Sequence, residues 1–148
     1  MRMTTESLFS IRDAAEGDLP AINAMSAAEG MGIIDASDVV FVAVNADEEA
    51  VGFIRLAHDE EQGCHINPVV VYPTWRRYGV GKALVAYALD RFGELRLVSR
   101  GTSLAFYEAL GFEAIPWEMI SAPIAAECDG CEAIGECNPV PMRKKRTP

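Results

Sequence analysis

The stretch VYPTWRRYGVGK, residues 71–82, decides how the chain folds around it. It separates an apolar, β-branched run at residues 64–72 from an amphipathic segment at residues 79–92. Free N–H groups and the dipole at a helix N-terminus attract anions, and glycines let a phosphate approach the main chain. Three basic residues add positive charge: Arg76, Arg77 and Lys82. The stretch therefore predicts a strand, an anion-binding loop and a helix, in that order.

The two glycines of this stretch, Gly79 and Gly81, are also compatible with ordinary turn chemistry. They do not form the dinucleotide-binding fingerprint, which places Gly-x-Gly-x-x-Gly at the first strand turn with an acidic residue about 20 positions later. Here the glycines lie in the middle of the chain and follow arginines. A pyrophosphate is the anion that fits this pattern.

Outside this stretch, hydrophobic periodicity alternates between strands and helices. On the N-terminal side it predicts a strand at residues 9–12, a helix from residue 18 and a hairpin of strands at residues 39–45 and 50–57. On the C-terminal side it predicts a strand at residues 95–98, a helix at 102–110 and a strand at 112–115. Pro68 cannot donate to a sheet ladder, so we expect a bulge or splayed pairing at residues 67–69. The alternation predicts an α/β fold.

Composition and charge narrow the function. The 148 residues are 50% hydrophobic and 24% charged, which is typical of one globular domain. The uncharged runs are shorter than the roughly 20 apolar residues of a membrane span, and residues 1–10 do not resemble a secretory signal, so we expect a cytoplasmic protein. The net charge of −9 opposes binding to nucleic acid or to anionic membranes, so we expect neither as a partner.

Three segments together resemble the GNAT superfamily of N-acetyltransferases. The pattern Val-x-Pro-x-x-Arg-x-x-Gly-x-Gly at residues 71–81 is similar to the acetyl-CoA signature of that family. The segments IRDA at residues 11–14 and DLPAI at 18–22 resemble the family's opening, and AFYEALGF at 105–112 resembles its closing motif. The resemblance implies the GNAT fold, a mixed, mostly antiparallel and splayed central sheet flanked by helices. It also implies acetyl-CoA as the acetyl donor.

The resemblance assigns roles to named residues. Val69 and Val71 would offer backbone groups to the acetyl and pantetheine portion of acetyl-CoA. The pyrophosphate would be held by the amides of six consecutive residues, with Arg76 adding charge in front of them: Arg77, Tyr78, Gly79, Val80, Gly81 and Lys82. Tyr107 would be the general acid that protonates the leaving thiolate. The alternative for Tyr107 is a packing tyrosine on a short helix.

The general base is less clearly marked. The family often places a glutamate 11 positions before the first arginine of the loop, and here that position is His65. A histidine with a reference pKa near 6.5 can accept a proton at neutral pH, directly or through water. A structural histidine at the sheet surface is the alternative. Glu60 and Glu61 are reserve candidates, and a water chain is another route.

The end of the chain points to the acceptor. Residues 111–116, the cysteines Cys128, Cys131 and Cys137, and Met142 resemble the ending of short bacterial amino-acid N-acetyltransferases of the N-acetylglutamate synthase type. We therefore expect a small amine as acceptor, an amino acid in particular and glutamate as one option. Arg55 or Arg100 would bind its carboxylate, although an exposed salt bridge is the alternative for each.

The domain boundary is expected near residue 116. Residues 9–116 would form the acetyltransferase domain, and residues 117–148 an irregular cysteine-containing extension packed on it. The basic run at residues 143–146 is interpreted as a solvated, frayed tail. The three cysteines allow a metal site, a redox-linked disulfide or reduced packing cysteines, and reduced cysteines suit a cytosolic protein.

Two other functions remain open from sequence. One is a non-catalytic acyl-CoA sensor, which the histidine at the base position permits. The other is acetylation of a protein N-terminus or lysine, for which residues 59–61 would line an acidic groove. A homodimer is compatible with exposed strand edges.

Overall fold

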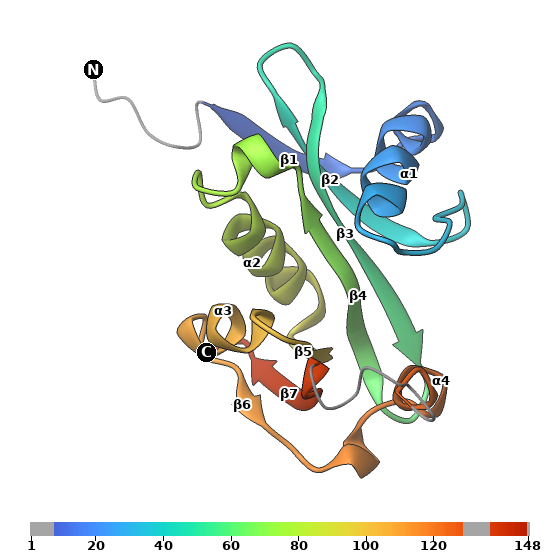
Figure 1. Cartoon of the computed structure of the whole chain (residues 1–148), viewed down its shortest axis with the longest axis vertical. Helices are drawn as coiled ribbons and strands as arrows, with labels where there is room; N and C mark the ends of the chain where they lie inside the picture. Colours follow the sequence, from blue (N-terminus) through green and yellow to red (C-terminus); the bar gives the residue numbers. More distant parts are fainter. Residues whose placement is uncertain (1–7, 129–136, 148) are drawn as a thin grey trace. The chain divides into compact units, whose positions relative to one another are not determined.

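The computed structural model describes residues 8–128 and 137–147 (Figure 1). They form two compact units. The first unit contains residues 8–57 and 67–91, and the second contains the other described residues. Two strands, β3 (Ala50–Asp59) and β4 (Gly63–Val71), contribute residues to both units.

The first unit is a small antiparallel sheet with two helices. Its first strands are β1 (Phe9–Asp13) and β2 (Val39–Asn45), and β2 pairs antiparallel with both β1 and β3. The β-branched and aromatic residues of β2 suit a pleated, buried surface. Figure 1 shows the helices α1 (Leu19–Ala28) and α2 (Val80–Phe92) on opposite sides of β2 and β3.

Strand alternation gives each helix its own face of this sheet. On the α1 face, Phe53 and three valines of β2 form a buried cluster with Ile22 and Met25. Gly52 precedes Phe53 and therefore faces the other side. A Cβ atom at Gly52 would lie 3.0 Å from Val80 Cγ1 and 3.1 Å from the Val70 carbonyl oxygen. The start of α2 thus packs directly on the backbone of β3.

This close approach predicts a cost for any side chain at position 52. We expect Gly52→Ala to lower the free energy of unfolding by about 1–3 kcal/mol, because overpacking forces the neighbouring backbone to move. Urea denaturation measures the change. Gly32→Ala is the control, since a Cβ at Gly32 meets no atom within 4 Å. Equal stability of the two variants would contradict the packing argument.

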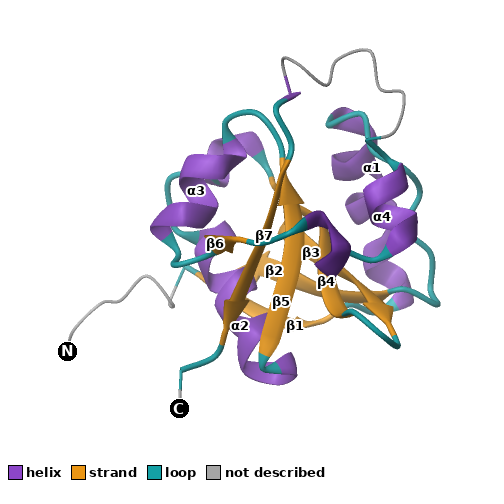
Figure 2. Ribbon diagram, turned by 90° about the horizontal axis from the view of Figure 1, so that it is seen from below, coloured by secondary structure: helices purple, strands orange, loops and turns teal. Residues whose placement is uncertain are grey.

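The second unit places three strands side by side. These are β5 (Glu94–Ser99), β6 (Glu113–Ala114) and β7 (Val140–Lys145), with β7 between the other two and antiparallel to both (Figure 2). The helices of this unit are α3 (Ser103–Ala109) and α4 (Ala122–Ala126).

The expectation of an irregular extension at residues 117–148 is wrong where the chain forms the helix α4 and the strand β7. The frayed tail expected at residues 143–146 is wrong as well, because Arg143 pairs with both Arg96 and Glu113 in the sheet. Charged residues are depleted in strands, so local propensity did not indicate a strand at residues 143–145. The strand is decided by its neighbours: Met142, opposite Leu97, is almost fully buried.

The strand order in the described part of the chain is β1-β2-β3-β4-β5-β7-β6. The β4–β5 pairing, at His65 and Arg96, is parallel, whereas the β1–β2, β2–β3, β5–β7 and β6–β7 pairings are antiparallel. The mixed, mostly antiparallel α/β fold is therefore confirmed. None of the helices in the described ranges could cross a bilayer, since they are too short or too polar for it.

Candidate active site

The anion-binding loop predicted from sequence lies in the first unit, between β4 and α2. A 3-10 turn at Pro73–Trp75 leads into an exposed segment that ends at Gly79. Gly79 has a φ of 78°, a left-handed conformation that favours glycine. Its carbonyl accepts the Ala83 N–H at 3.0 Å, which closes the first turn of α2. The preceding amides, up to Lys82, belong to the helix end that lacks intrahelical acceptors.

The loop residues fit a bound pyrophosphate. A Cβ atom at Gly79 meets no atom within 4 Å, so the space in front of the helix end is open. Arg77 and Lys82 are exposed beside it, and Val80 is fully buried and anchors the turn. Open amides, positive charge and a rigid anchor are the features that a phosphate requires.

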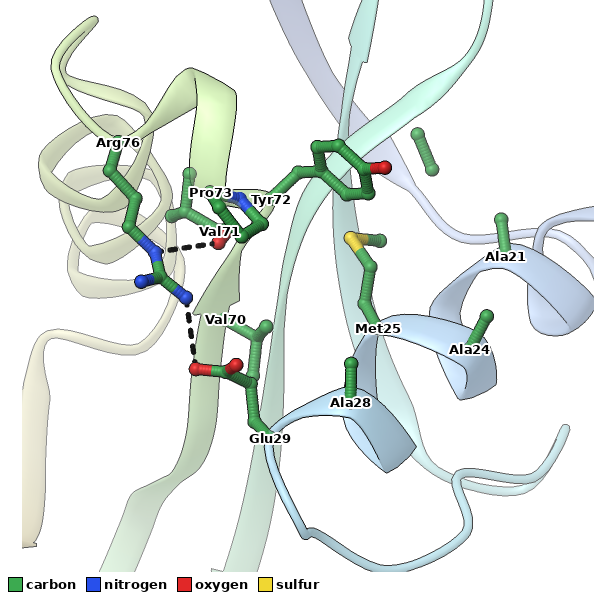
Figure 3. Close-up of a pocket in the computed structure, with 11 residues that line it drawn as sticks. Ala21, Ala24, Met25, Ala28, Glu29, Val70, Val71, Tyr72, Pro73 and Arg76 are labelled. Carbon is green, nitrogen blue, oxygen red and sulfur yellow. Dashed lines mark hydrogen bonds and ion pairs between the residues drawn. The ribbon is translucent and has the colours of Figure 1, made fainter.

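The Arg76 side chain makes contacts that sequence did not indicate. Its Nε donates to the Val71 carbonyl at 3.1 Å, and its terminal nitrogen lies 2.9 Å from Glu29 Oε1 at the end of α1 (Figure 3). The guanidinium therefore joins the end of β4 to the residue that follows α1. Val71 uses its carbonyl for this bond.

Beside this ion pair lies a cavity of about 220 Å³ in the first unit. Its walls come from α1 and from the end of β4 (Figure 3). They are almost entirely apolar, and the charged members are Glu29 and Arg76. The other lining residues are Ala21, Ala24, Met25, Ala28, Ala50, Val70, Val71, Tyr72 and Pro73.

Arg55, a predicted carboxylate ligand, also lies in the first unit. Its Nε donates to the Asn67 carbonyl at 2.6 Å, and a terminal nitrogen lies 3.8 Å from Asp38. Asn67 precedes Pro68, where the β4 ladder was expected to be irregular. The Asn67 carbonyl accepts its hydrogen bond from the Arg55 side chain. Arg55 thus supports β4 from the neighbouring strand.

Tyr107, the predicted general acid, lies on α3 in the second unit. Its side chain is 6% exposed and packs edge-on against Phe106 and Phe112, with ring centroids 5.0 and 5.3 Å away. Burial raises the pKa of the phenol above its usual value. The phenol is protonated at neutral pH, as an ordinary tyrosine is, and its raised pKa makes it a weaker proton donor than a solvated phenol.

His65, the predicted base, is fully buried in the second unit. The Ser121 N–H donates to Nε2 at 3.1 Å, so Nδ1 carries the proton and donates to the Gly63 carbonyl at 3.1 Å. Both nitrogens of the neutral ring are thus engaged. This geometry favours the structural role that sequence left open, and a direct role as base stays a prediction that requires the Ser121 bond to break.

The buried ring also predicts how stability depends on pH. Burial is the main reason that the pKa of His65 lies below its ordinary value, and nearby Arg96 acts in the same direction. The Gly63 carbonyl, Asp59 and Glu94 act against it. The unfolded chain binds this proton more readily than the folded chain does. The contribution of His65 to the free energy of unfolding is therefore fully present above about pH 6.5 and is lost as the pH falls through the lowered pKa.

We expect the unfolding free energy to fall below pH 6.5 with a slope of up to about 1.4 kcal/mol per pH unit from this group. His65→Gln keeps an acceptor for Ser121 and should remove that slope. Denaturant titrations between pH 7 and pH 5 measure it, with His58→Gln at an exposed position as control. The same pH profile in His65→Gln and the wild type would contradict the prediction.

Arg100 and the described cysteines lie in the second unit. Arg100 donates to Glu127 at 3.1 Å and lies 4.0 Å from the Cys128 sulfur. Cys64, Cys128 and Cys137 are free thiols, whereas Cys131 lies outside the described residues. In residues 8–128 and 137–147 no three acidic, cysteine or histidine side chains gather as a metal site would require.

Sequence reasoning missed Glu29 and the alanines of α1. Glu29 and Arg76 are 47 positions apart, so no local pattern connects them. Ala21, Ala24 and Ala28 recur at helical spacing on one face of α1, and this spacing was the available signal. The predicted cofactor residues and Arg55 share the first unit, whereas His65, Arg100 and Tyr107 belong to the second.

The α/β fold, with an exposed glycine-containing loop before α2, is compatible with a phosphorylated cofactor. The family model described as Acetyltransferase (GNAT) domain matches residues 36–114, which is more than half of the chain. The chain belongs to the GNAT acetyltransferase family.

Known proteins share part of the sequence or the fold. Aminoglycoside N(6')-acetyltransferase type 1 of Stenotrophomonas maltophilia is 44% identical over 62 residues, and the match covers 36% of this chain and 40% of that relative. N-acetylglutamate synthase from Neisseria gonorrhoeae, complexed with coenzyme A and N-acetyl-glutamate, has a similar fold (TM-score 0.73, 17% identity, 95% of this chain and 35% of that chain). Nourseothricin acetyltransferase is similar too (TM-score 0.68, 20% identity, 93% and 98% covered).

Proposed function

We propose that the chain is an acetyl-CoA-dependent N-acetyltransferase that acetylates a small amine, with an amino acid as acceptor. The observation that carries the proposal is the loop before α2, where the left-handed Gly79 opens a helix N-terminus between exposed basic residues. An exposed helix N-terminus of this kind would bind an anion, and the resemblance places the cofactor pyrophosphate at this loop. Acetyl-CoA would supply an activated acetyl group there.

The reaction needs two proton movements. The neutral amine attacks the thioester carbonyl, so a C–N bond forms as the C–S bond breaks. The thiolate takes a proton, and the attacking nitrogen loses one. We assign the first proton to Tyr107, whose buried phenol stays protonated at neutral pH. We assign the second to water, and His65 would receive it only after its bond from the Ser121 N–H breaks.

A polycationic amine is the second class of acceptor to consider. A hollow of about 500 Å³ in the first unit is lined partly by carboxylates, those of Asp18, Glu48 and Glu49. Carboxylates attract ammonium groups, and a curated relative of this chain is an aminoglycoside acetyltransferase. Asp18 already holds Arg12 through two hydrogen bonds of 2.7 and 3.0 Å, which reduces the charge available for such an acceptor.

Thiol release from acetyl-CoA tests the proposal. The assay covers the twenty amino acids, polyamines, an aminoglycoside and peptides with free N-termini at pH 7 to 8. Turnover on an amino acid supports the proposal, and turnover on the polyamines or the aminoglycoside alone selects the second class. Coenzyme A binding without turnover on any amine would instead indicate a sensor.

A further inference from the structure

We propose that the cavity between α1 and β4 binds the apolar side chain of an α-amino acid acceptor, with Glu29 and Arg76 holding its ammonium and carboxylate. The inference rests on the proposed acetyltransferase function and narrows the acceptor class. It favours aliphatic amino acids such as leucine and methionine over glutamate.

The walls of the cavity determine the side chain. Ala21, Ala24 and Ala28 lie on successive turns of α1 and leave space because a methyl group is all that each contributes. The opposite wall is formed by β4 residues such as Val70. These walls are mainly apolar, so they favour contact with an aliphatic chain over contact with a carboxylate.

The rim of the cavity fits a zwitterion. Glu29 and Arg76 present charges of opposite sign beside each other, 2.9 Å apart, and both side chains are partly exposed. The contact between Glu29 and Arg76 leaves further hydrogen-bonding groups on both side chains. A guanidinium has five N–H donors, and Arg76 uses one toward Glu29 and one toward Val71. A carboxylate has a second oxygen. An α-amino acid has the matching pair of charges on two groups attached to the same carbon.

The cavity also borders the strand where the thioester is expected. Val70 and Val71 line it, and Val69 and Val71 are the residues whose backbone would hold the acetyl and pantetheine portion. An acceptor seated there has its amine at the rim and its side chain against β4. Apolar contact alone distinguishes modestly between amino acids of different side-chain length, since one methylene in such a pocket changes kcat/KM by about 10- to 200-fold.

Kinetics with a series of amino acids tests this. With acetyl-CoA saturating, we expect kcat/KM for L-leucine and L-methionine to exceed that for glycine and L-glutamate by about 10-fold or more. Ala24→Leu fills the cavity and should lower kcat/KM for L-leucine by about 10-fold, with coenzyme A affinity unchanged. Ala27→Leu is the matched control, since Ala27 is exposed on the same helix and does not line the cavity.

The rim has its own test. Glu29→Gln should raise KM for L-leucine by about 10-fold, and 3-methylbutylamine, which lacks the carboxylate, should be a similarly poorer acceptor than leucine. Preference for glutamate would overturn the inference. So would weaker coenzyme A binding in Ala24→Leu, because the cavity would then belong to the donor.

Direct binding separates the inference from the proposed function. Calorimetry of L-leucine with the protein in coenzyme A does not depend on turnover. If leucine binds, Ala24→Leu abolishes that binding and no turnover is seen, the result supports the cavity as the leucine site and overturns the proposed enzyme function. Turnover on other amines with no leucine binding overturns the cavity alone. If the protein shows neither leucine binding nor turnover on any amine, both the cavity proposal and the proposed enzyme function are overturned.

Discussion

Tyr107→Phe is expected to lower kcat by about 100-fold or more, since a positioned general acid contributes about 10²–10⁴ to the rate. The substitution keeps the ring that packs on Phe106 and Phe112 and removes only the hydroxyl. Coenzyme A affinity and thermal stability should therefore change little. Steady-state thiol release, together with calorimetry of coenzyme A binding, separates the two effects.

The control is Tyr87→Phe on α2, where the hydroxyl accepts an exposed hydrogen bond from Arg91 at 3.1 Å. It should retain the wild-type rate. If Tyr107→Phe also retains that rate, Tyr107 is a packing residue and solvent protonates the thiolate. A sensor, by contrast, would keep coenzyme A binding in both variants and show no turnover in the wild type.

Gly79→Val is expected to weaken coenzyme A binding by about 10-fold or more. Position 79 has a φ of 78°, which costs a residue with a side chain about 1–2 kcal/mol, and relaxing that strain turns the amides at the start of α2 away from the phosphates. Calorimetry or dye displacement with coenzyme A measures the loss.

The chain offers a matched control at the other end of the same helix. Gly93 has a φ of 81°, and a Cβ there also meets no atom within 4 Å. Gly93→Val should cost similar stability but leave coenzyme A affinity unchanged, because Gly93 is remote in sequence from the anion-binding loop. Equal loss of affinity in both variants would mean that general destabilisation, not the loop, explains the effect.

Much of the candidate cofactor site was predictable because its signals are local. The apolar strand, the loop glycines and the helix beginning at Val80 lie within one continuous stretch, and each follows from backbone sterics or side-chain periodicity. The structure adds that Gly79 lies in the left-handed region, which the sequence did not predict. The roles assigned to the cofactor, acid and base residues remain predictions for the experiments above.

The sequence by itself determined the family and the alternation of strands and helices up to about residue 115, and it predicted the anion-binding loop. Only the tertiary structure decided that residues 140–145 form a strand between β5 and β6, and that both nitrogens of His65 are engaged within the fold. It also decided that Arg76 reaches Glu29 across 47 positions of chain. The physical reason is the same in each case. Local propensity and periodicity depend on neighbours in sequence, whereas strand pairing, burial and ion pairing depend on groups that only folding brings together.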